Sequence, residues 1–182
     1  MRGVPYAGEW RPTKNMPNPP ERGFLEKQTV ALLQLGPTLG QGANCLVAEA
    51  EPGASAVNVP SRLAVKMFSV AHEAGGMAQV MWEVHVLRQL QHENVVRLCD
   101  VVEMADAVYL VMERIEGPDL GQHIRAQPGG FLQEREARTF FRQLLAALRH
   151  AHNRNFLHGD LKPENIRLDD SCTQVRVVGG TG

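Results

Sequence analysis

The segment HGDLKPEN, His158–Asn165, brings a histidine, two acids, a lysine and an asparagine together within eight residues. A loop that only connects two elements needs no such density of polar side chains, whereas catalytic and binding residues concentrate on loops that a rigid scaffold holds. The segment therefore predicts a chemical site. The elements before and after it decide which chemistry that site supports.

Composition limits the classes of protein that need to be considered. The chain has 182 residues, 43% of them hydrophobic, which is enough apolar material for the core of one domain. The formal net charge is -1 and the charges are interspersed, without the basic stripe of a nucleic-acid-binding protein. No apolar run is long enough for a membrane span, and the first residues lack the apolar core of a secretory signal. We therefore expect neither nucleic acid nor a membrane among its partners.

The cysteines indicate the cellular compartment. Cys45, Cys99 and Cys172 are an odd, widely spaced set without a CxxC pair. This spacing fits neither a disulfide framework nor a structural zinc site. We expect a reducing, intracellular environment and hence a cytoplasmic protein, with the nucleus left open.

Residues 1–30 contain five prolines and no sustained apolar period, so we predict a flexible extension there and order from Ala31 onward. The stretch that follows reads as strand, glycine turn, strand, with apolar residues alternating on either side of the turn. A third strand is expected around RLAVKMFSV, residues 62–70, after a Gly- and Pro-containing loop. The sequence thus predicts three strands, of which the first two form a hairpin.

Two helices are expected from apolar spacing. Residues Ala78–Gln91 place Val80, Val84, Leu87 and Leu90 close to one helical face. A longer helix, about Gln133–His152, carries a continuous apolar stripe. The stripe consists of Ala137, Phe140, Phe141, Leu144, Leu145, Leu148 and Ala151.

The remaining expected elements are strands. Two lie between the helices, at Val95–Val102 and Val108–Arg114, and EGPDL (residues 116–120) then connects the two halves of the fold. After HGDLKPEN come a short IRL strand, a DDSCTQ turn and a VRVV strand.

The glycine turn follows the pattern G-x-G-x-x-C-x-V, from Gly40 through Cys45 to Val47. A dinucleotide-binding loop leads from a strand into a helix, but here a strand follows, which argues against that class. A tight hairpin turn without ligand is one interpretation. A loop that exposes backbone N–H groups to phosphates is the other.

Lys66 lies in the third strand, whose composition predicts burial on at least one face. An isolated strand lysine can extend its ammonium group to solvent, which is the simplest interpretation. Glu83, however, falls at the edge of the apolar face of the first helix. A buried carboxylate requires a cation, so we predict an ion pair between Lys66 and Glu83.

The order of these motifs resembles the eukaryotic-type protein kinase domain, of the serine/threonine kind because Lys162 follows Asp160. The resemblance covers about Leu35 to Val178 and includes EVHVLRQLQHENVVRL, Glu83–Leu98. It implies an α+β, protein kinase-like fold, in which residues 31–115 form a small antiparallel-sheet lobe with one main helix and a hinge. It also implies the first part of a helical lobe over residues 116–182.

The resemblance implies that the chain uses ATP and Mg²⁺ to act on a protein substrate. Gly40 and Gly42 would cover the phosphates of ATP, and Lys66 would contact those phosphates while paired to Glu83. Asp119 matches a residue that contacts the ribose. These are the implied contacts with the polar part of the nucleotide.

The adenine ring would be flanked by Val47 and Ala64. Met112 matches the residue that guards the back of the nucleotide pocket. Glu113 and Ile115 match the hinge, whose backbone hydrogen-bonds adenine.

In the catalytic loop, Asp160 would accept or orient the proton of the substrate hydroxyl. Lys162 would steady the transferred phosphoryl group, and Asn165 would bind magnesium. His158 is expected to orient the loop rather than to react.

Three positions depart from the pattern of the family. Gly159 replaces an arginine that in many members contacts the phosphorylated activation loop. Arg167 stands at the aliphatic floor of the adenine pocket, where it must turn aside or crowd the base, so we expect weakened ATP binding. Gly179 stands at the metal-binding aspartate, which removes one magnesium-holding group.

Because the resemblance ends near Val178, we expect an incomplete kinase domain without activation segment and later helices. The stripe of the long helix is then exposed, which predicts self-association. The alternative is a pseudokinase or truncated binding module that acts through protein contacts. Activity as a kinase and action as such a module both stay open at this point.

Overall fold

The computed structural model describes residues 11–12, 33–41, 45–52, 62–69, 76–104 and 107–179. They form two compact units. The sheet unit contains the described residues between 33 and 89 and those between 97 and 114. The helical unit contains residues 11–12, 90–96 and 115–179. The predicted extension 1–30 lies outside the described residues, apart from Arg11 and Pro12.

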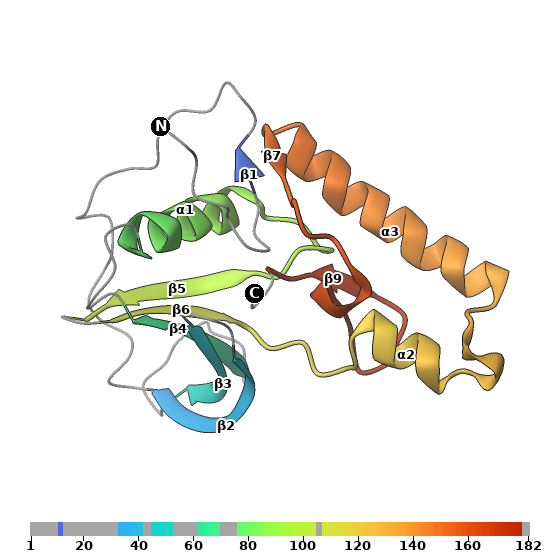
Figure 1. The fold of residues 1–182 in the computed structure, drawn as a ribbon, viewed down its shortest axis with the longest axis horizontal. Helices are drawn as coiled ribbons and strands as arrows, with labels where there is room; N and C mark the ends of the chain where they lie inside the picture. Colours follow the sequence, from blue (N-terminus) through green and yellow to red (C-terminus); the bar gives the residue numbers. More distant parts are fainter. Residues whose placement is uncertain are drawn as a thin grey trace. The chain divides into compact units, whose positions relative to one another are not determined.

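The sheet unit is a five-stranded antiparallel sheet with strand order β2-β3-β4-β6-β5 and one helix, α1, which runs alongside it (Figure 1). The protein kinase-like α+β architecture predicted for this part is confirmed. Its elements are β2 (Leu33–Gln41), β3 (Cys45–Pro52), β4 (Leu63–Ser69), α1 (Gly76–Gln89), β5 (Leu98–Glu103) and β6 (Ala107–Glu113).

The predicted glycine hairpin is confirmed by the pairing of β2 with β3, in which Gly40 faces Val47. The pairing contains two register shifts, between Leu35 and Gly40, so β2 does not follow a regular ladder into the turn. Gly42 lies outside the described residues.

Both faces of β4 are shielded from water. Leu63 and Val65 pack with Ala50 and Val111 into one apolar cluster on one face. On α1, the predicted face is buried, with Val80 at 2% and Leu87 at 3% exposure. This unit therefore has its own core.

The first helix ends two residues before the predicted Gln91, and β5 begins at Leu98 rather than at the predicted Val95. The early end of the helix and the late start of β5 have the same cause: residues 90–96 belong to the helical unit. Val96 N donates to Val177 O at 3.0 Å, and Val177 N donates to Asn94 O at 2.9 Å. These bonds to a distant strand replace the continuous β5 that the valine-rich sequence suggested.

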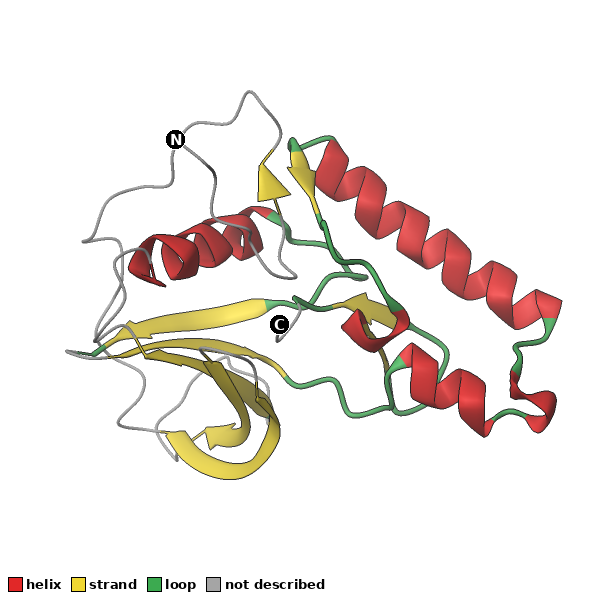
Figure 2. Cartoon of the chain, in the orientation of Figure 1, coloured by secondary structure: helices red, strands yellow, loops and turns green. Residues whose placement is uncertain are grey.

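The helical unit is dominated by the long helix α3, beside which lie a shorter helix and the last strands (Figures 1 and 2). The two-residue β1 pairs with β7, and β8 pairs with β9. Its elements are β1 (Arg11–Pro12), α2 (Leu120–Ala126), the 3₁₀ turn η2 (Pro128–Gly130), α3 (Glu134–His152), β7 (Phe156–Leu157), the 3₁₀ turn η3 (Pro163–Asn165), β8 (Ile166–Leu168) and β9 (Val175–Val177).

Helix α2 was not predicted. Asp119 begins it as the N-cap: its side chain accepts from Gln122 N at 2.7 Å, and the Gln122 side chain accepts from Asp119 N at 3.2 Å. This reciprocal capping box satisfies two backbone donors that a helix start leaves open.

The predicted stripe of α3 is only partly exposed. Phe140 is buried in a cluster with Leu120, Ile166 and other residues of the unit. Phe141 and Leu145 are 61% and 49% exposed, so exposure is confirmed for these two members. In the described residues, no helix is both long and apolar enough to cross a membrane.

Candidate active site

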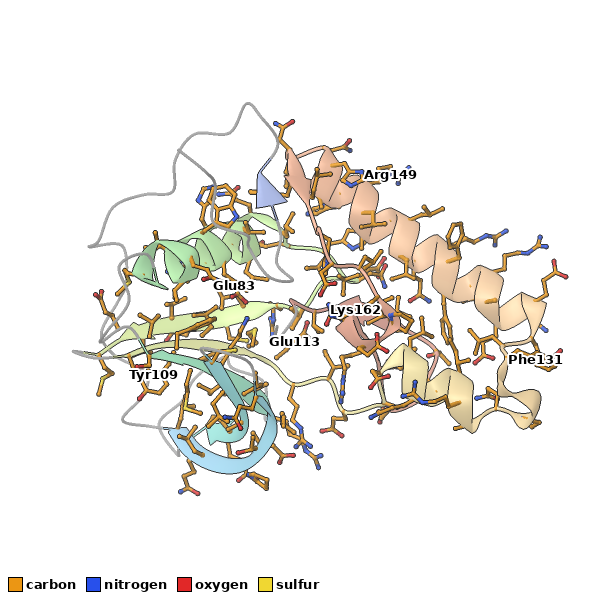
Figure 3. All side chains as sticks on the ribbon, in the orientation of Figure 1. Glu83, Tyr109, Glu113, Phe131, Arg149 and Lys162 are labelled. Atoms are coloured by element: carbon orange, nitrogen blue, oxygen red, sulfur yellow. The ribbon has the colours of Figure 1, made fainter. Side chains whose placement is uncertain are left out.

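The predicted pair of Lys66 and Glu83 is confirmed. Lys66 Nζ lies 2.9 Å from each carboxylate oxygen of Glu83, so the contact is bidentate. Both side chains are 4% exposed. Glu83, labelled in Figure 3, belongs to α1, and Lys66 belongs to β4. The alternative, in which Lys66 extends to solvent, does not apply.

The position of Lys66 follows from strand alternation. Burial of both faces of β4 leaves no exposed position in its centre, so a lysine there needs a polar partner inside the protein. Phe68, two residues further and on the same face, places its ring centroid 4.8 Å from Nζ. The ammonium group is thus held by a carboxylate and an aromatic ring.

The sheet brings several predicted nucleotide-binding residues to one face. Lys66 pairs with Val47 on one side and with Leu110 on the other, and Ala64 pairs with Met112. Residues directly opposite in an antiparallel pair share a face, as do residues two apart on one strand. Val47, Ala64, Lys66 and Met112 therefore lie on the same face of the sheet, and Gly40, opposite Val47, belongs to it too.

The predicted hinge residues fall at the end of the sheet unit and the start of the helical unit. Glu113 ends β6, where its N–H donates to Arg97 O at 3.0 Å and its side chain accepts from Arg97 N at 2.8 Å. Ile115 begins the helical part, and its carbonyl accepts from Arg167 Nη2 at 3.5 Å. Asp119 caps α2, as described above, and is 9% exposed.

The catalytic-loop residues form one cluster inside the helical unit. Lys162 Nζ lies 2.8 Å from Asp160 Oδ2. Asn165 Nδ2 donates to the same carboxylate oxygen at 3.1 Å and to Asp160 O at 2.8 Å. The sequence placed these three residues in one loop, and η3 turns the chain so that all three meet at one carboxylate. Lys162 is labelled in Figure 3.

This geometry determines the charge of the cluster. The hydrogen bond from Lys162 holds the pKa of the Asp160 carboxyl below its usual value, and Asn165 acts in the same direction. The same bond raises the pKa of Lys162. Asp160 is therefore an ionised carboxylate at neutral pH and Lys162 an ammonium. A carboxylate can orient a hydroxyl proton, and an ammonium can neutralise a phosphoryl oxygen.

His158 is buried beneath this loop. Its Nε2 lies 3.2 Å from Val178 O, and its Nδ1 accepts from Asp160 N at 3.4 Å. Burial lowers the pKa of the imidazole, so the neutral ring is favoured. The neighbouring Gly159 has φ of 71°, a left-handed conformation that suits glycine. These contacts support the expected orienting role of His158.

The backbone places Gly179 next to the cluster. Val178 N donates to Asn165 O at 3.0 Å, which joins the end of β9 to the loop just before Gly179. Asn165 uses its amide nitrogen on Asp160, which leaves its side-chain oxygen as the atom that could bind a metal. Gly179 adds no side-chain ligand.

Sequence reasoning missed two residues that hold β9 in place. Asn94 donates through Nδ2 to Val175 O at 2.9 Å. Gln143 on α3 accepts from Val175 N at 2.8 Å and donates to Thr173 O at 2.9 Å. Nothing in the spacing of a single asparagine or glutamine indicates such a partner, because the contacts join residues far apart in sequence.

Comparison with known proteins agrees with this geometry. The model of the protein kinase domain family matches residues 33–178, and the chain belongs to that family. Sperm motility kinase 2B of Mus musculus is 48% identical over 90 residues, which cover 50% of this chain and 18% of that protein. CBL-interacting protein kinase 20 of Oryza sativa subsp. japonica is 38% identical over 148 residues, or 80% of this chain and 32% of that protein. The chain thus spans a third or less of the length of these relatives.

Proposed function

We propose that the chain carries the nucleotide-binding and catalytic-loop part of a serine/threonine protein kinase that transfers the γ-phosphoryl group of ATP to a protein hydroxyl. Membership of the protein kinase domain family supports phosphoryl transfer in general. The serine/threonine preference is inferred from Lys162, two residues after Asp160.

The observation that carries the proposal is the buried, bidentate pair of Lys66 and Glu83. Replacing a buried ion pair by apolar residues of similar volume is often neutral or stabilising, so stability alone does not call for one. A lysine fixed by a carboxylate and presented on the same sheet face as Val47 and Ala64 suits the neutralisation of ATP phosphates. In this proposal Gly40 and Gly42 cover those phosphates.

The remaining assignments follow the same reasoning. Val47, Ala64 and Met112 would surround adenine, whose polar edge would meet the backbone of Glu113 and Ile115. In the loop, Asp160 would orient the substrate hydroxyl while Lys162 neutralises the transferred group. Asp119 would offer its second carboxylate oxygen to the ribose, because Oδ1 accepts from Gln122 N in the cap of α2.

The magnesium site fits only in part. Mg²⁺ is held in proteins by one or two carboxylates together with waters and substrate phosphates. Asn165 offers one neutral oxygen, and Gly179 offers no side chain. This observation favours a second candidate function, a binding module with weak or no catalysis, in which the kinase fold acts through protein contacts.

A thermal-shift titration with Mg-ATP, and with ATP plus chelator, separates the two candidates. The kinase proposal expects magnesium-dependent stabilisation and transfer of labelled phosphate to a generic protein substrate. Asp160→Asn should abolish transfer without loss of nucleotide-dependent stabilisation. Stabilisation by ATP that is independent of magnesium, without any transfer, would instead support the binding module.

A matched variant tests the metal argument directly. Gly179→Asp restores a carboxylate beside Asn165 and should increase the magnesium-dependent part of the thermal shift. If the natural chain transfers phosphate and Gly179→Asp does so at the same rate, the missing carboxylate does not limit the reaction.

For localisation and assembly we propose a cytoplasmic protein, supported by the cysteine pattern, and self-association through the exposed apolar residues of the helical unit. Phe141, Leu145 and Phe131 are 61%, 49% and 58% exposed. Phe131, labelled in Figure 3, lies in the connection before α3. Sedimentation of the natural chain against Phe141→Ser/Leu145→Ser checks the association.

A further inference from the structure

Two histidines lie against each other inside the helical unit, and the proposed function does not use them. His92 belongs to the segment of residues 90–96, and His150 lies in the last turn of α3. Their ring centroids are 4.9 Å apart, with an angle of 50° between the ring planes. Since both residues belong to the helical unit, the contact lies within one compact part of the chain.

The hydrogen bonds of the two rings determine their protonation state. Asn94 N donates to Nδ1 of His92 at 3.0 Å, and a backbone N–H can only donate. Arg154 Nη1 lies 3.2 Å from Nδ1 of His150, and a guanidinium has no acceptor. Both Nδ1 atoms therefore accept, so both rings are neutral and carry their proton on Nε2. A second proton would have to bind at Nδ1, where it would break the bond from the present donor.

The surroundings of His150 disfavour a positive charge on its ring. Its Nε2 is buried and has no hydrogen-bond partner among the described residues. Burial lowers the pKa of His150, and Arg154 and His92 act in the same direction. Glu93, the one acid between residues 90 and 96, is exposed and is not among the groups that act on this ring. No nearby carboxylate of the described chain therefore offsets a charge on His150.

The segment that carries His92 also holds β9 in place. Asn94 Nδ2 donates to Val175 O at 2.9 Å, and the Asn94 carbonyl accepts from Val177 N at 2.9 Å. Val96 N donates to Val177 O at 3.0 Å. A displacement of His92 would therefore reach β9 through the short stretch of backbone that leads to Val96.

We propose that His92 and His150 form a proton-sensitive latch, which holds residues 90–96 against α3 while His150 is neutral and releases them, together with β9, when it is protonated. A charged ring whose Nε2 is buried needs water, and it reaches water by leaving the contact with His92. The latch should open as the pH falls below about 6.5, the value near which an unperturbed histidine titrates. Val178 N donates to Asn165 O at 3.0 Å, which joins β9 to the catalytic loop, so release of β9 also loosens that loop. The inference goes beyond the proposed function, and its test needs neither ATP nor phosphoryl transfer.

Hydrogen exchange of backbone amides, corrected for its intrinsic dependence on pH, tests the latch. The amides of Val96 and Val177 report on the join between the segment and β9, and the amide of Ala147, buried in α3, reports on opening of the whole unit. Between about pH 7.5 and 5.5, the protection of Val96 and Val177 should fall about tenfold more than that of Ala147, which corresponds to the loss of one hydrogen bond. His150→Phe, which keeps a ring but cannot take up a proton, should abolish this difference.

Three variants assign the effect to the latch. His152→Phe changes an exposed histidine in the same turn of α3 and should behave like the natural chain. Arg154→Gln removes the neighbouring cation, so protonation of His150 becomes easier and the fall should begin at a higher pH. His158→Gln removes the other buried histidine near β9, which lies 3.2 Å from Val178 O, and should leave the difference in place.

Three results would overturn the inference. A fall of the same size in His150→Phe would mean that this ring is not the sensor. Loss of the fall in His158→Gln would assign the effect to His158. NMR spectra that place the imidazole proton of His150 on Nδ1 at about pH 7.5 would contradict the hydrogen bond on which the latch depends. If His150→Phe melts at a lower temperature than the natural chain, His150→Gln, which is neutral and polar, repeats the exchange measurement.

Discussion

Removal of Lys66 should destabilise the sheet unit strongly, because it would leave the Glu83 carboxylate buried without its cation. Lys66→Met keeps the length and apolar stem of the side chain but removes the ammonium group. Both carboxylate oxygens of Glu83 now lie 2.9 Å from Nζ, and the carboxylate is 4% exposed, so water cannot replace the lost partner without rearrangement.

The magnitude follows from burial. Removing one partner of a buried ion pair costs about 3–5 kcal/mol, against a total stability of about 5–15 kcal/mol for a typical domain. Glu83→Leu should also be damaging because it removes the carboxylate that holds the buried ammonium, although the ring of Phe68 at 4.8 Å retains part of the stabilisation. The double variant Lys66→Met/Glu83→Leu buries no charge and should be close to the natural chain or above it.

Urea unfolding followed by tryptophan fluorescence measures these differences, since Trp82 on α1 is buried and adjacent to Glu83 in sequence. The ion pair of Arg114 and Glu49, at 2.6 Å, is a more accessible control in the same unit, with side chains 23% and 27% exposed. Breaking it with Arg114→Met should cost no more than about 1 kcal/mol. If Lys66→Met costs as little as this control, or if the two single changes add in the double variant, the pair is not a buried, coupled one.

Two further predictions concern the helical unit. Gly117→Ala should lower stability by about 1–3 kcal/mol, because its Cβ would lie 2.2 Å from Asp169 O and 2.4 Å from Leu168 O. Gly121→Ala, whose Cβ would meet only side-chain atoms at 3.1 Å or more, should lose less in the same thermal melt. Stability should also fall as pH drops below about 6.5, because burial lowers the pKa of His158 and the unfolded chain then binds more protons. The pKa of His150 is lowered in the same direction by its burial, Arg154 and His92. His158→Gln should reduce the change of the urea midpoint with pH, measured between about pH 5 and 8. If the midpoint of the variant changes with pH as much as that of the natural chain, His158 is not the group responsible.

The elements with strict apolar spacing were predictable from the sequence. The second helix begins at Glu134, one residue after the predicted start, and ends at the predicted His152. The strand of Lys66 and the glycine hairpin were also placed correctly, because alternation and the glycine pattern are local signals. The ion pair between Lys66 and Glu83 could be predicted because a buried carboxylate is stable only with a cation or hydrogen-bond donors beside it.

Long-range contacts were not predictable in the same way. The start of β5 was wrong because Val95 and Val96 have the composition of a strand but make their hydrogen bonds with Val177, which lies far along the chain. Helix α2 was missed because it has only 7 residues and begins at Leu120, the last residue of the segment EGPDL that was interpreted as a connection. The direction of Arg167 depends on main-chain contacts between β8 and the segment after Ile115, and no local pattern encodes them.

The departures from the kinase pattern are unevenly distributed, and this bears on which function the chain retains. Lys66 and Glu83 keep their pairing in the sheet unit, whereas Gly159, Arg167 and Gly179 all belong to the helical unit. Gly159 and Gly179 remove side chains, while Arg167 adds a charge at the hinge carbonyl. Under the proposed function, we expect such a chain to keep Lys66 for the phosphates and the Asp160 carboxylate for the substrate, but to bind the base and the metal less well. Restoration of both, in Arg167→Leu/Gly179→Asp, should therefore raise magnesium-dependent ATP binding more than either change alone. Equal binding by the double variant and the natural chain would show that neither position limits the site.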